Sequence, residues 1–211
     1  MVSKGLFIVC EGMEGTGKST QSIKLAQWLF DYSKSIDSVV LTREYTNSRF
    51  AQEIRRRLKE MHNPDENRER LMELYVLDRE YHVDNMIVPN LAKNAIVVSD
   101  RYKHSTICYQ GAQGVATTRL VEENNGFPIP DITIVFNASV DTVMSRLQSR
   151  KADEQIFEHR EFLEKVKENY ARLPQLLPKE KIVFINANQT PEQVHEDVIK
   201  AVKPLVDAII R

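Results

Sequence analysis

The sequence predicts an α/β protein with a five-stranded parallel sheet sandwiched by helices. Two observations predict this fold class. Five short apolar runs alternate with helical segments along the chain, and strands that alternate with helices form parallel sheets covered on both faces. The first run, residues 6–10, also leads straight into a glycine-rich stretch and then into a helical segment. This order of strand, loop and helix is typical of proteins that bind phosphate groups.

The glycine-rich stretch carries the most specific motif in the chain. It fits the pattern G-x-x-x-x-G-K-[ST] at every specified position, as Gly12-Met13-Glu14-Gly15-Thr16-Gly17-Lys18-Ser19. Glycines allow a tight turn in which successive N–H groups point at phosphate oxygens, and the following helix N-terminus adds partial positive charge. In this pattern Lys18 reaches the β- and γ-phosphates, and the Ser19 hydroxyl is offered to Mg²⁺.

Length and composition limit the classes of function. A chain of 211 residues can bury one good core, so we expect a single domain over residues 1–211. The formal net charge of −1 gives no basic field for nucleic acid. The first apolar run is too short for a signal or membrane segment, so the sequence predicts a soluble cytoplasmic protein. Cys10 and Cys108 are expected to be packing residues rather than a disulfide or a metal pair.

The other elements follow from periodicity and turn signals. Apolar runs predict strands at residues 38–42, 95–100, 132–136 and 181–185. Helical patterns predict helices at residues 21–30, 49–61, 67–88, 103–114 and 192–210, with an interrupted helical stretch at 140–173. The first of these helices carries apolar residues at Ile23, Leu25, Ala26 and Leu29. Pro89 is expected to end the helix at 67–88.

Charged residues stand at the ends of two predicted strands. The second strand is followed by Arg43, and the third ends in Asp100, with Arg101 next. Ligands of open α/β sheets bind at the carboxyl edge of the strands, so these side chains are expected near a ligand. An aspartate at such a strand end usually holds Mg²⁺, directly or through water, opposite a phosphate loop.

Two further groups of residues have an ordinary structural interpretation. Residues of mixed character share one face of the predicted helix 67–88 by their spacing of three or four: Leu71, Leu74, Tyr75, Asp78, Arg79 and His82. Taken alone, they fit a core stripe with a solvated charge at its edge better than a pocket wall. The basic cluster Arg146, Arg150 and Lys151 likewise fits a solvated helix surface.

The motifs taken together resemble the thymidylate kinases, which are P-loop nucleoside monophosphate kinases. Residues 7–20 are similar to the family pattern F-x-x-x-E-G-x-[DE]-G-x-G-K-S-T, and residues 42–44 to T-R-E-P. Residues 74–79 are similar to L-[FY]-x-x-D-R, and residues 99–111 to S-D-R-Y-x-x-S-x-x-A-Y-Q-G. The resemblance covers nearly the whole chain. It implies a P-loop NTPase architecture and transfer of the ATP γ-phosphoryl group to dTMP, which gives dTDP and ADP.

The resemblance also assigns roles to residues of this chain. The implied ATP-binding residues are Gly12, Met13, Glu14, Gly15, Thr16, Gly17, Lys18, Ser19 and Thr20. The implied dTMP-binding residues are Glu14, Arg43, Tyr75, Arg79, Arg101, Ser105, Thr106, Tyr109 and Gln110. Among these, Tyr75 would stack on the thymine, and Arg79 and Thr106 would bond its edge. Residues 186–189 would border the adenine, Ser19 and Asp100 would hold Mg²⁺, and the protein would be a homodimer.

Two departures from the family pattern concern mobile parts. The pattern R-E-P is Arg43-Glu44-Tyr45 here, in a predicted mobile acceptor-binding segment at about residues 44–66. A second mobile segment, a lid at about residues 146–160, holds Ile156 where the family often has arginine. The phosphate loop is neutral at Gly15 and Thr16, so the catalytic cation of the lid is expected to be Arg150, with Arg146 second. The implied catalytic set is Lys18, Arg43, Asp100, Arg101, Arg150 and Arg146.

Two alternatives stay open at this point. A kinase for another monophosphate or for a deoxynucleoside would keep the same loop. A nucleoside acceptor would need a carboxylate that takes the hydroxyl proton, and Glu11 and Glu14 stand near the loop. The missing lid arginine also fits a nucleotide-binding regulatory protein without catalysis.

Overall fold

The computed structural model of the chain describes residues 2–61, 63, 66–149 and 159–210. The predicted fold class is confirmed, because five parallel strands form one sheet in the order β2-β3-β1-β4-β5. The strands are β1 (Leu6–Gly12), β2 (Val39–Arg43), β3 (Ile96–Asp100), β4 (Ile132–Asn137) and β5 (Ile182–Asn186). The helices are α1 (Lys18–Tyr32), α2 (Arg49–Glu60), α3 (Arg68–His82), η1 (Val83–Ile87), α4 (Val88–Leu91), α5 (Lys103–Ala112), α6 (Thr117–Glu123), α7 (Val140–Ser149), α8 (Arg160–Leu176) and α9 (Pro191–Ile209).

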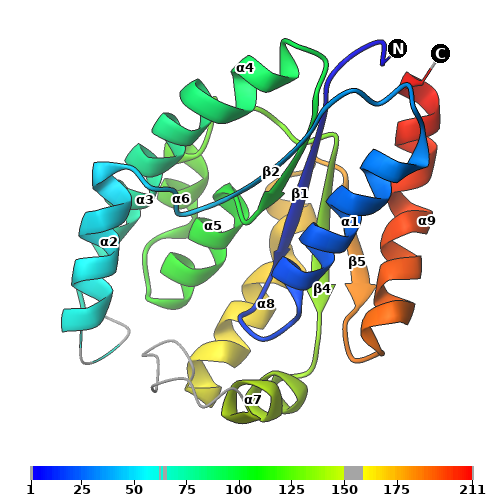
Figure 1. The fold of residues 1–211 in the computed structure, drawn as a ribbon. Coiled ribbons are helices and arrows are strands. Elements are labelled where there is room, and N and C mark those ends of the chain that lie inside the picture. The colour runs from blue at the N-terminus through cyan, green and yellow to red at the C-terminus, as the bar shows by residue number, and fades with distance from the viewer. Residues whose placement is uncertain (1, 62, 64–65, 150–158, 211) are drawn as a thin grey trace.

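Helices cover both faces of the sheet. The central strand β1 is buried along its whole length, as a near-continuous apolar run requires of a parallel strand. Helices α1 and α9 pack against each other beside the sheet, and α5 packs on α8 (Figure 1). The free thiols of Cys10 and Cys108 lie in this core, where burial raises the pKa of Cys10 to about 12, so their predicted packing role is confirmed. No helix of the described residues has the length and apolar character needed to cross a membrane.

The expectation that Pro89 ends a helix is wrong. The chain continues from α3 through the π-helical turn η1 into α4, and Pro89 lies in the first turn of α4. Proline lacks an N–H and its ring clashes with the carbonyl four residues earlier. The wider π turn changes the hydrogen-bond register just before the proline, and the helix therefore continues to Leu91.

Two local features of the fold differ from the sequence pattern. Ile23 on α1 is 59% exposed, whereas Leu25 and Leu29 are fully buried. The buried face of α1 instead includes Gln21 and Ser22, because it meets α9 and the phosphate loop rather than only the sheet. Helix α6 was not predicted, since Leu120 is its one buried side chain and gives no apolar period.

The register of the strands brings the predicted site residues to one edge. Cys10 of β1 pairs with Asp100 of β3, and Asp100 pairs with Arg43 of β2. On the other side of β1, Gly12 pairs with Phe136 of β4. Because all five strands are parallel, the phosphate loop, Arg43 and Asp100 leave the sheet at the same carboxyl edge.

Candidate functional site

The phosphate loop has the geometry that its glycines predict. Gly12 has φ +139°, and a Cβ there would lie 2.7 Å from the carbonyl oxygen of Phe136, so only glycine fits. Gly17 has φ +91° and is the N-cap of α1. Within the loop, Thr16 Oγ1 donates to the carbonyl of Met13 over 2.8 Å, which holds the turn closed. The loop therefore presents the N-terminus of α1 at the carboxyl edge of the sheet.

Lys18 is buried behind this loop. Its ammonium donates to the carbonyl of Met13 over 3.1 Å and lies 3.8 Å from the Glu14 carboxylate. Burial is the main reason why its pKa falls to about 8, and the Arg101 guanidinium lowers the pKa further. Because burial disfavours the charged ammonium of Lys18, an anion bound beside it would stabilise that charge.

Ser19 and Asp100 meet at the mouth of the loop. The Ser19 hydroxyl donates to Asp100 Oδ2 over 2.5 Å. The second oxygen, Asp100 Oδ1, is buried and has no hydrogen-bond partner among the described residues. A buried carboxylate oxygen without a partner is costly. A hydroxyl beside a carboxylate is an oxygen set that suits Mg²⁺, so these residues fit that ion.

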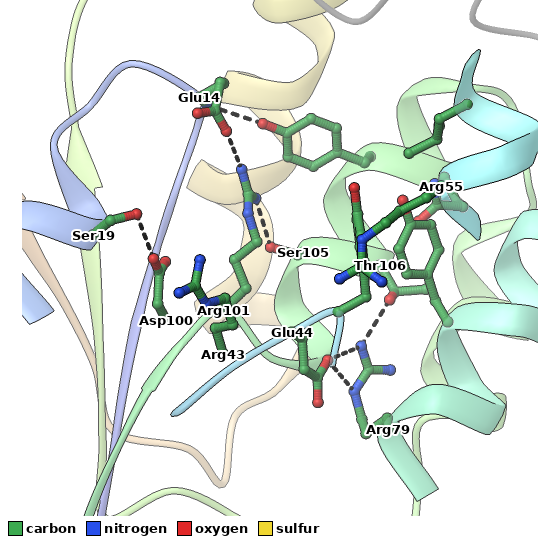
Figure 2. Close-up of a pocket in the computed structure, with 15 residues that line it drawn as sticks. Glu14, Ser19, Arg43, Glu44, Arg55, Arg79, Asp100, Arg101, Ser105 and Thr106 are labelled. Atoms are coloured by element: carbon green, nitrogen blue, oxygen red, sulfur yellow. Dashed lines mark hydrogen bonds and ion pairs between the residues drawn. The ribbon is translucent and has the colours of Figure 1, made fainter. Parts of the chain in front are cut away.

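A cavity of about 420 Å³ opens beside the loop, a size typical of small-molecule sites. All nine residues that the resemblance assigns to dTMP line it, together with Ser19 and Asp100 (Figure 2). The lining also includes residues that the sequence analysis did not assign to the site: Glu44, Tyr45, Arg55 and Leu58. The structure thus gathers segments 14–19, 43–58, 75–79 and 100–110 around one space.

Cations gather at the sheet side of this cavity. Arg101 donates to Glu14 Oε2 over 2.7 Å and to Ser105 Oγ over 3.0 Å. Arg43 is exposed, and it makes no ion pair with any residue that the structure describes. Figure 2 shows Arg43 and Arg101 beside each other near Asp100. Both guanidinium groups are therefore placed where an anionic group of a ligand could enter.

Arg79 lies at the opposite wall and is 1% exposed. Its guanidinium donates twice to Glu44 Oε2, over 3.0 and 2.7 Å, once to Thr106 Oγ1 and once to Asn124 Oδ1. Since arginine has five N–H donors, these four bonds engage all but one of them. The predicted face of α3 therefore belongs both to the core and to the wall of the cavity, because Arg79 forms a buried ion pair with Glu44 and also lines the cavity.

Aromatic rings form a third wall. The rings of Tyr45 and Tyr75 lie 6.0 Å apart between centroids, and the Arg55 guanidinium lies 4.8 Å from the centroid of the Tyr45 ring. Arg55 also donates to the carbonyl of Thr46 over 2.8 Å. The peptide bond between Glu44 and Tyr45 is cis. The sequence does not identify Arg55 as a site residue, because α2 contains several arginines and no local pattern shows which of them points toward the cavity.

The acceptor-side segment is fastened to α3. Asp78 accepts hydrogen bonds from the backbone N–H of Thr46 over 2.8 Å and from its hydroxyl over 2.5 Å. It also accepts from the hydroxyl of Ser48 over 2.6 Å, and Ser48 in turn caps the N-terminus of α2. Neighbouring residues of α3, Asp78 and Arg79, thus fix both ends of the stretch 44–48.

A second cavity of about 280 Å³ lies on the other side of the phosphate loop. It is lined by Gly15, Thr16, Gly17, Thr20, Gln21, Arg146, Ala187, Gln189, Pro191 and Val194. Arg146 donates to the carbonyl of Gly15 over 3.5 Å, so α7 brings this cation against the loop. Asn188 accepts from the backbone N–H of Ser139 and from the Thr142 hydroxyl, each over 2.9 Å, which joins the loop 186–190 to α7. Arg150 and most of the predicted lid lie outside the described residues.

The two carboxylates near the loop are already engaged. Glu11 is fully buried and accepts from the hydroxyls of Ser105 and Tyr170 over 2.8 Å. Glu14 is partly exposed and pairs with Arg101. A base that takes a proton from a nucleoside hydroxyl must reach the substrate, and Glu11 does not reach the cavity surface. The geometry therefore favours an ionised phosphate over a nucleoside hydroxyl as the acceptor.

Comparison with known proteins gives a consistent result. A model of the family described as thymidylate kinase matches residues 10–198. A probable thymidylate kinase of Thermococcus kodakarensis is 36% identical over 207 residues, which cover 95% of this chain and 98% of the relative. A thymidylate kinase of Nitratidesulfovibrio vulgaris is 36% identical over 98% of this chain and 100% of its own. A thymidylate kinase of Desulfotalea psychrophila is 36% identical over 96% of both chains.

Proposed function

Because this chain belongs to the thymidylate kinase family, we propose that it phosphorylates dTMP with ATP, and that its larger cavity holds dTMP and its smaller cavity holds ATP. The observation that carries this assignment is the placement of the two cavities on either side of one phosphate loop. Glu14 and Ser19 line the larger cavity, whereas Gly15 and Gly17 line the smaller one. A donor phosphate on the loop would then face the phosphate of the acceptor.

The walls of the larger cavity suit a thymine nucleotide. The paired cations Arg43 and Arg101 would hold the acceptor phosphate, and Tyr75 would stack on the base. Thymine presents a carbonyl acceptor and an N–H donor at its edge. Arg79 and Thr106, which both line the cavity, would bond the edge of the base. The amide N–H₂ of Gln110 donates to the side-chain oxygen of Gln113 over 3.0 Å. The side-chain carbonyl oxygen of Gln110 would then accept from the base N–H.

The smaller cavity suits a nucleoside triphosphate. Backbone N–H groups of the loop and the N-terminus of α1 would bind the phosphates, with Lys18 between the β- and γ-phosphates. Residues 186–189 would border the adenine. Mg²⁺ bound at Ser19 and Asp100 would neutralise charge on the β- and γ-phosphates.

Phosphoryl transfer between these two nucleotides needs positioning and charge neutralisation rather than covalent chemistry. The acceptor phosphate is already ionised, so no general base is required. Lys18, Arg43, Arg101 and an arginine from the region of the predicted lid would surround the transferred group. The sequence further predicts a single domain with mobile segments at about 44–66 and 146–160 and a cytoplasmic location, and the family resemblance implies a homodimer.

An ADP-release assay over a panel of acceptors tests this proposal. We expect release that depends on dTMP, is weaker with dUMP and UMP, and is absent with thymidine. Lys18→Ala is the matched control, and circular dichroism would show that it is folded while release is lost. Release with thymidine alone would favour a nucleoside kinase. Tight ATP binding with no release for any acceptor would favour the regulatory alternative.

A further inference from the structure

Glu11, directly before the phosphate loop, is a buried carboxylate with four hydrogen bonds. Oε1 accepts from the backbone N–H groups of Tyr102 and Ser105 over 2.8 and 3.1 Å. Oε2 accepts from the hydroxyls of Ser105 and Tyr170, each over 2.8 Å. The residue is 0% exposed. A charge buried so completely is tolerated only where hydrogen bonds replace its lost hydration.

The chemistry of these partners explains why the position holds a carboxylate. All four groups are donors, and an ionised glutamate is the acceptor-only side chain that matches them. Three of the four donors belong to the start of α5, namely the N–H groups of Tyr102 and Ser105 and the Ser105 hydroxyl, and the N-cap residue Tyr102 makes no side-chain cap. Glu11 therefore caps this helix from a distant strand, and its negative charge suits the positive end of the helix dipole.

The capped turn is the one that carries Arg101. Arg101 has φ +75°, a left-handed conformation that is costly for any residue but glycine and persists only where the surroundings fix it. Its backbone N–H is held by the carbonyl of Cys10 over 2.9 Å. Its guanidinium donates to Ser105 Oγ over 3.0 Å, and Ser105 Oγ donates to Glu11. Glu11 thus orients Arg101 twice, through the backbone N–H groups of Tyr102 and Ser105 that follow it and through the Ser105 hydroxyl.

We propose that Glu11 is a positioning residue that aims Arg101 at the phosphate of the acceptor nucleotide. The proposal rests on the function proposed above. In it, Glu11 touches no substrate. It fixes the hydroxyl of Ser105 so that an oxygen lone pair faces the guanidinium, and it ties this arrangement to the strand that begins the phosphate loop.

Binding of dTMP and thymidine distinguishes positioning from mere structural support, because the two ligands differ only in the phosphate. Glu11→Gln places an N–H₂ group against donors and should disturb the turn. We expect the Kd for dTMP to rise about tenfold, while the Kd for thymidine changes by less than about twofold. Arg101→Ala should show the same selective loss, and the double variant should lose little more than Arg101→Ala alone, since coupled residues are not additive.

Two milder variants keep the test decisive if Glu11→Gln does not fold. Ser105→Ala removes the hydroxyl between Glu11 and Arg101, and we expect about a threefold selective loss of dTMP binding. Tyr170→Phe removes a donor from the same carboxylate oxygen and a neighbour 3.3 Å from Ser105 Oγ, but it leaves the Ser105 hydroxyl and the Arg101 guanidinium in place. We expect it to lower the melting temperature and to change the ratio of the two Kd values less than Ser105→Ala does.

The outcomes separate this proposal from the proposed function. Equal weakening of dTMP and thymidine in Glu11→Gln, or additive losses with Arg101→Ala, would overturn the positioning role. A ratio that stays constant in Ser105→Ala, or that shifts equally in Tyr170→Phe, would overturn it as well. If the parent protein binds thymidine as tightly as dTMP and releases no ADP with dTMP, the proposed function fails instead.

Discussion

The charge of Lys18 makes nucleotide binding sensitive to pH. Burial lowers its pKa from 10.5 to about 8 in the free protein, with help from Arg101. Only the protonated ammonium attracts phosphate, so ATP should bind most tightly below pH 8. Above that pH we expect the Kd for ATP to rise by up to about tenfold per pH unit, because binding must then take up a proton. Titration calorimetry between pH 7 and 9.5 measures this dependence, in a range where the phosphate is largely ionised from the start.

Lys18→Ala is the control for this pH dependence. Its affinity for ATP should be weak and nearly constant over the same range, and a parent protein with a flat profile would contradict the expectation.

The same pKa change affects the stability of the free protein with a defined sign. Between pH 8 and 10.5 the unfolded chain holds a proton that folded Lys18 has lost, so the contribution of Lys18 to the free energy of unfolding rises with pH.

Tyr109 is expected to select deoxyribose. Its hydroxyl accepts from the backbone N–H of Glu14 over 3.0 Å, and its ring lies 6.2 Å from that of Phe162 between centroids, so the ring is held in place. The resemblance puts this ring against C2′ of the sugar. Tyr109→Ala should raise kcat/KM for UMP relative to dTMP by about tenfold or more, since such a wall discriminates by ~1–3 kcal/mol. Tyr109→Phe keeps the ring and should keep the ratio; equal ratios in all three proteins would show that the sugar is read elsewhere.

At the scale of elements, helix α7 carries a cation to the phosphate loop. Arg146 lies against the carbonyl of Gly15, and Arg150 remains the other predicted catalytic arginine. A well-placed arginine accounts for about 10³–10⁵ in the rate of related phosphoryl transfers. Replacing the catalytic one by alanine should therefore lower kcat far more than it raises the KM for dTMP, and lysine should rescue it only in part. Steady-state kinetics of Arg146→Ala and Arg150→Ala measure this, with exposed Gln148→Ala on α7 as control. If both alanine variants keep kcat within about threefold of the parent, neither Arg146 nor Arg150 is the catalytic arginine.

Helix α3 fastens the acceptor-side segment through Asp78. Asp78→Asn keeps one acceptor oxygen but places an N–H₂ group against at least one of the three donors, so it should cost about 1–3 kcal/mol of stability. The carbonyl of Thr46 accepts a hydrogen bond from Arg55 of the cavity wall, and Thr46 lies just before α2. We therefore also expect a higher KM for dTMP and an unchanged KM for ATP. Thermal unfolding and kinetics measure both effects. Arg56→Ala breaks exposed ion pairs on the solvent side of α2 and should change neither; a rise in the KM for ATP in Asp78→Asn would contradict a local role.

For the whole molecule, the sheet was predictable and the cavity walls only in part. Apolar runs marked every strand to within two residues at either end, because buried parallel strands are apolar on both faces. The positions of Arg43 and Asp100 followed from the parallel order, since all strands end at one edge. The motif gave the loop, and the resemblance gave the nine residues that line the larger cavity.

The remainder depends on contacts between segments far apart in the chain. No local signal shows that Arg79 pairs with Glu44, or that Arg55 rather than its neighbours on α2 points inward. Glu11 was considered only as a base, because its four donors come from Tyr102, Ser105 and Tyr170, which are distant in sequence. The exposure of Ile23 and the continuation of the helix past Pro89 were missed for the same reason, since tertiary packing overrides local pattern.

The separation of the two cavities predicts independent binding at the level of the whole fold. A ligand at 100 times its Kd adds about 2.7 kcal/mol to the free energy of unfolding, and in a chain of this size each kcal/mol raises the melting temperature by about 2–4 °C. The linings of the cavities share no residue. We therefore expect dTMP and a non-hydrolysable analogue of ATP each to raise the melting temperature, and the two ligands together to raise it by about the sum of the two separate increases. Thermal shift measurements with each ligand and with both test this, and Lys18→Ala should lose the response to the ATP analogue while keeping that to dTMP. A response to the ATP analogue that disappears at saturating dTMP would mean that both nucleotides compete for one site.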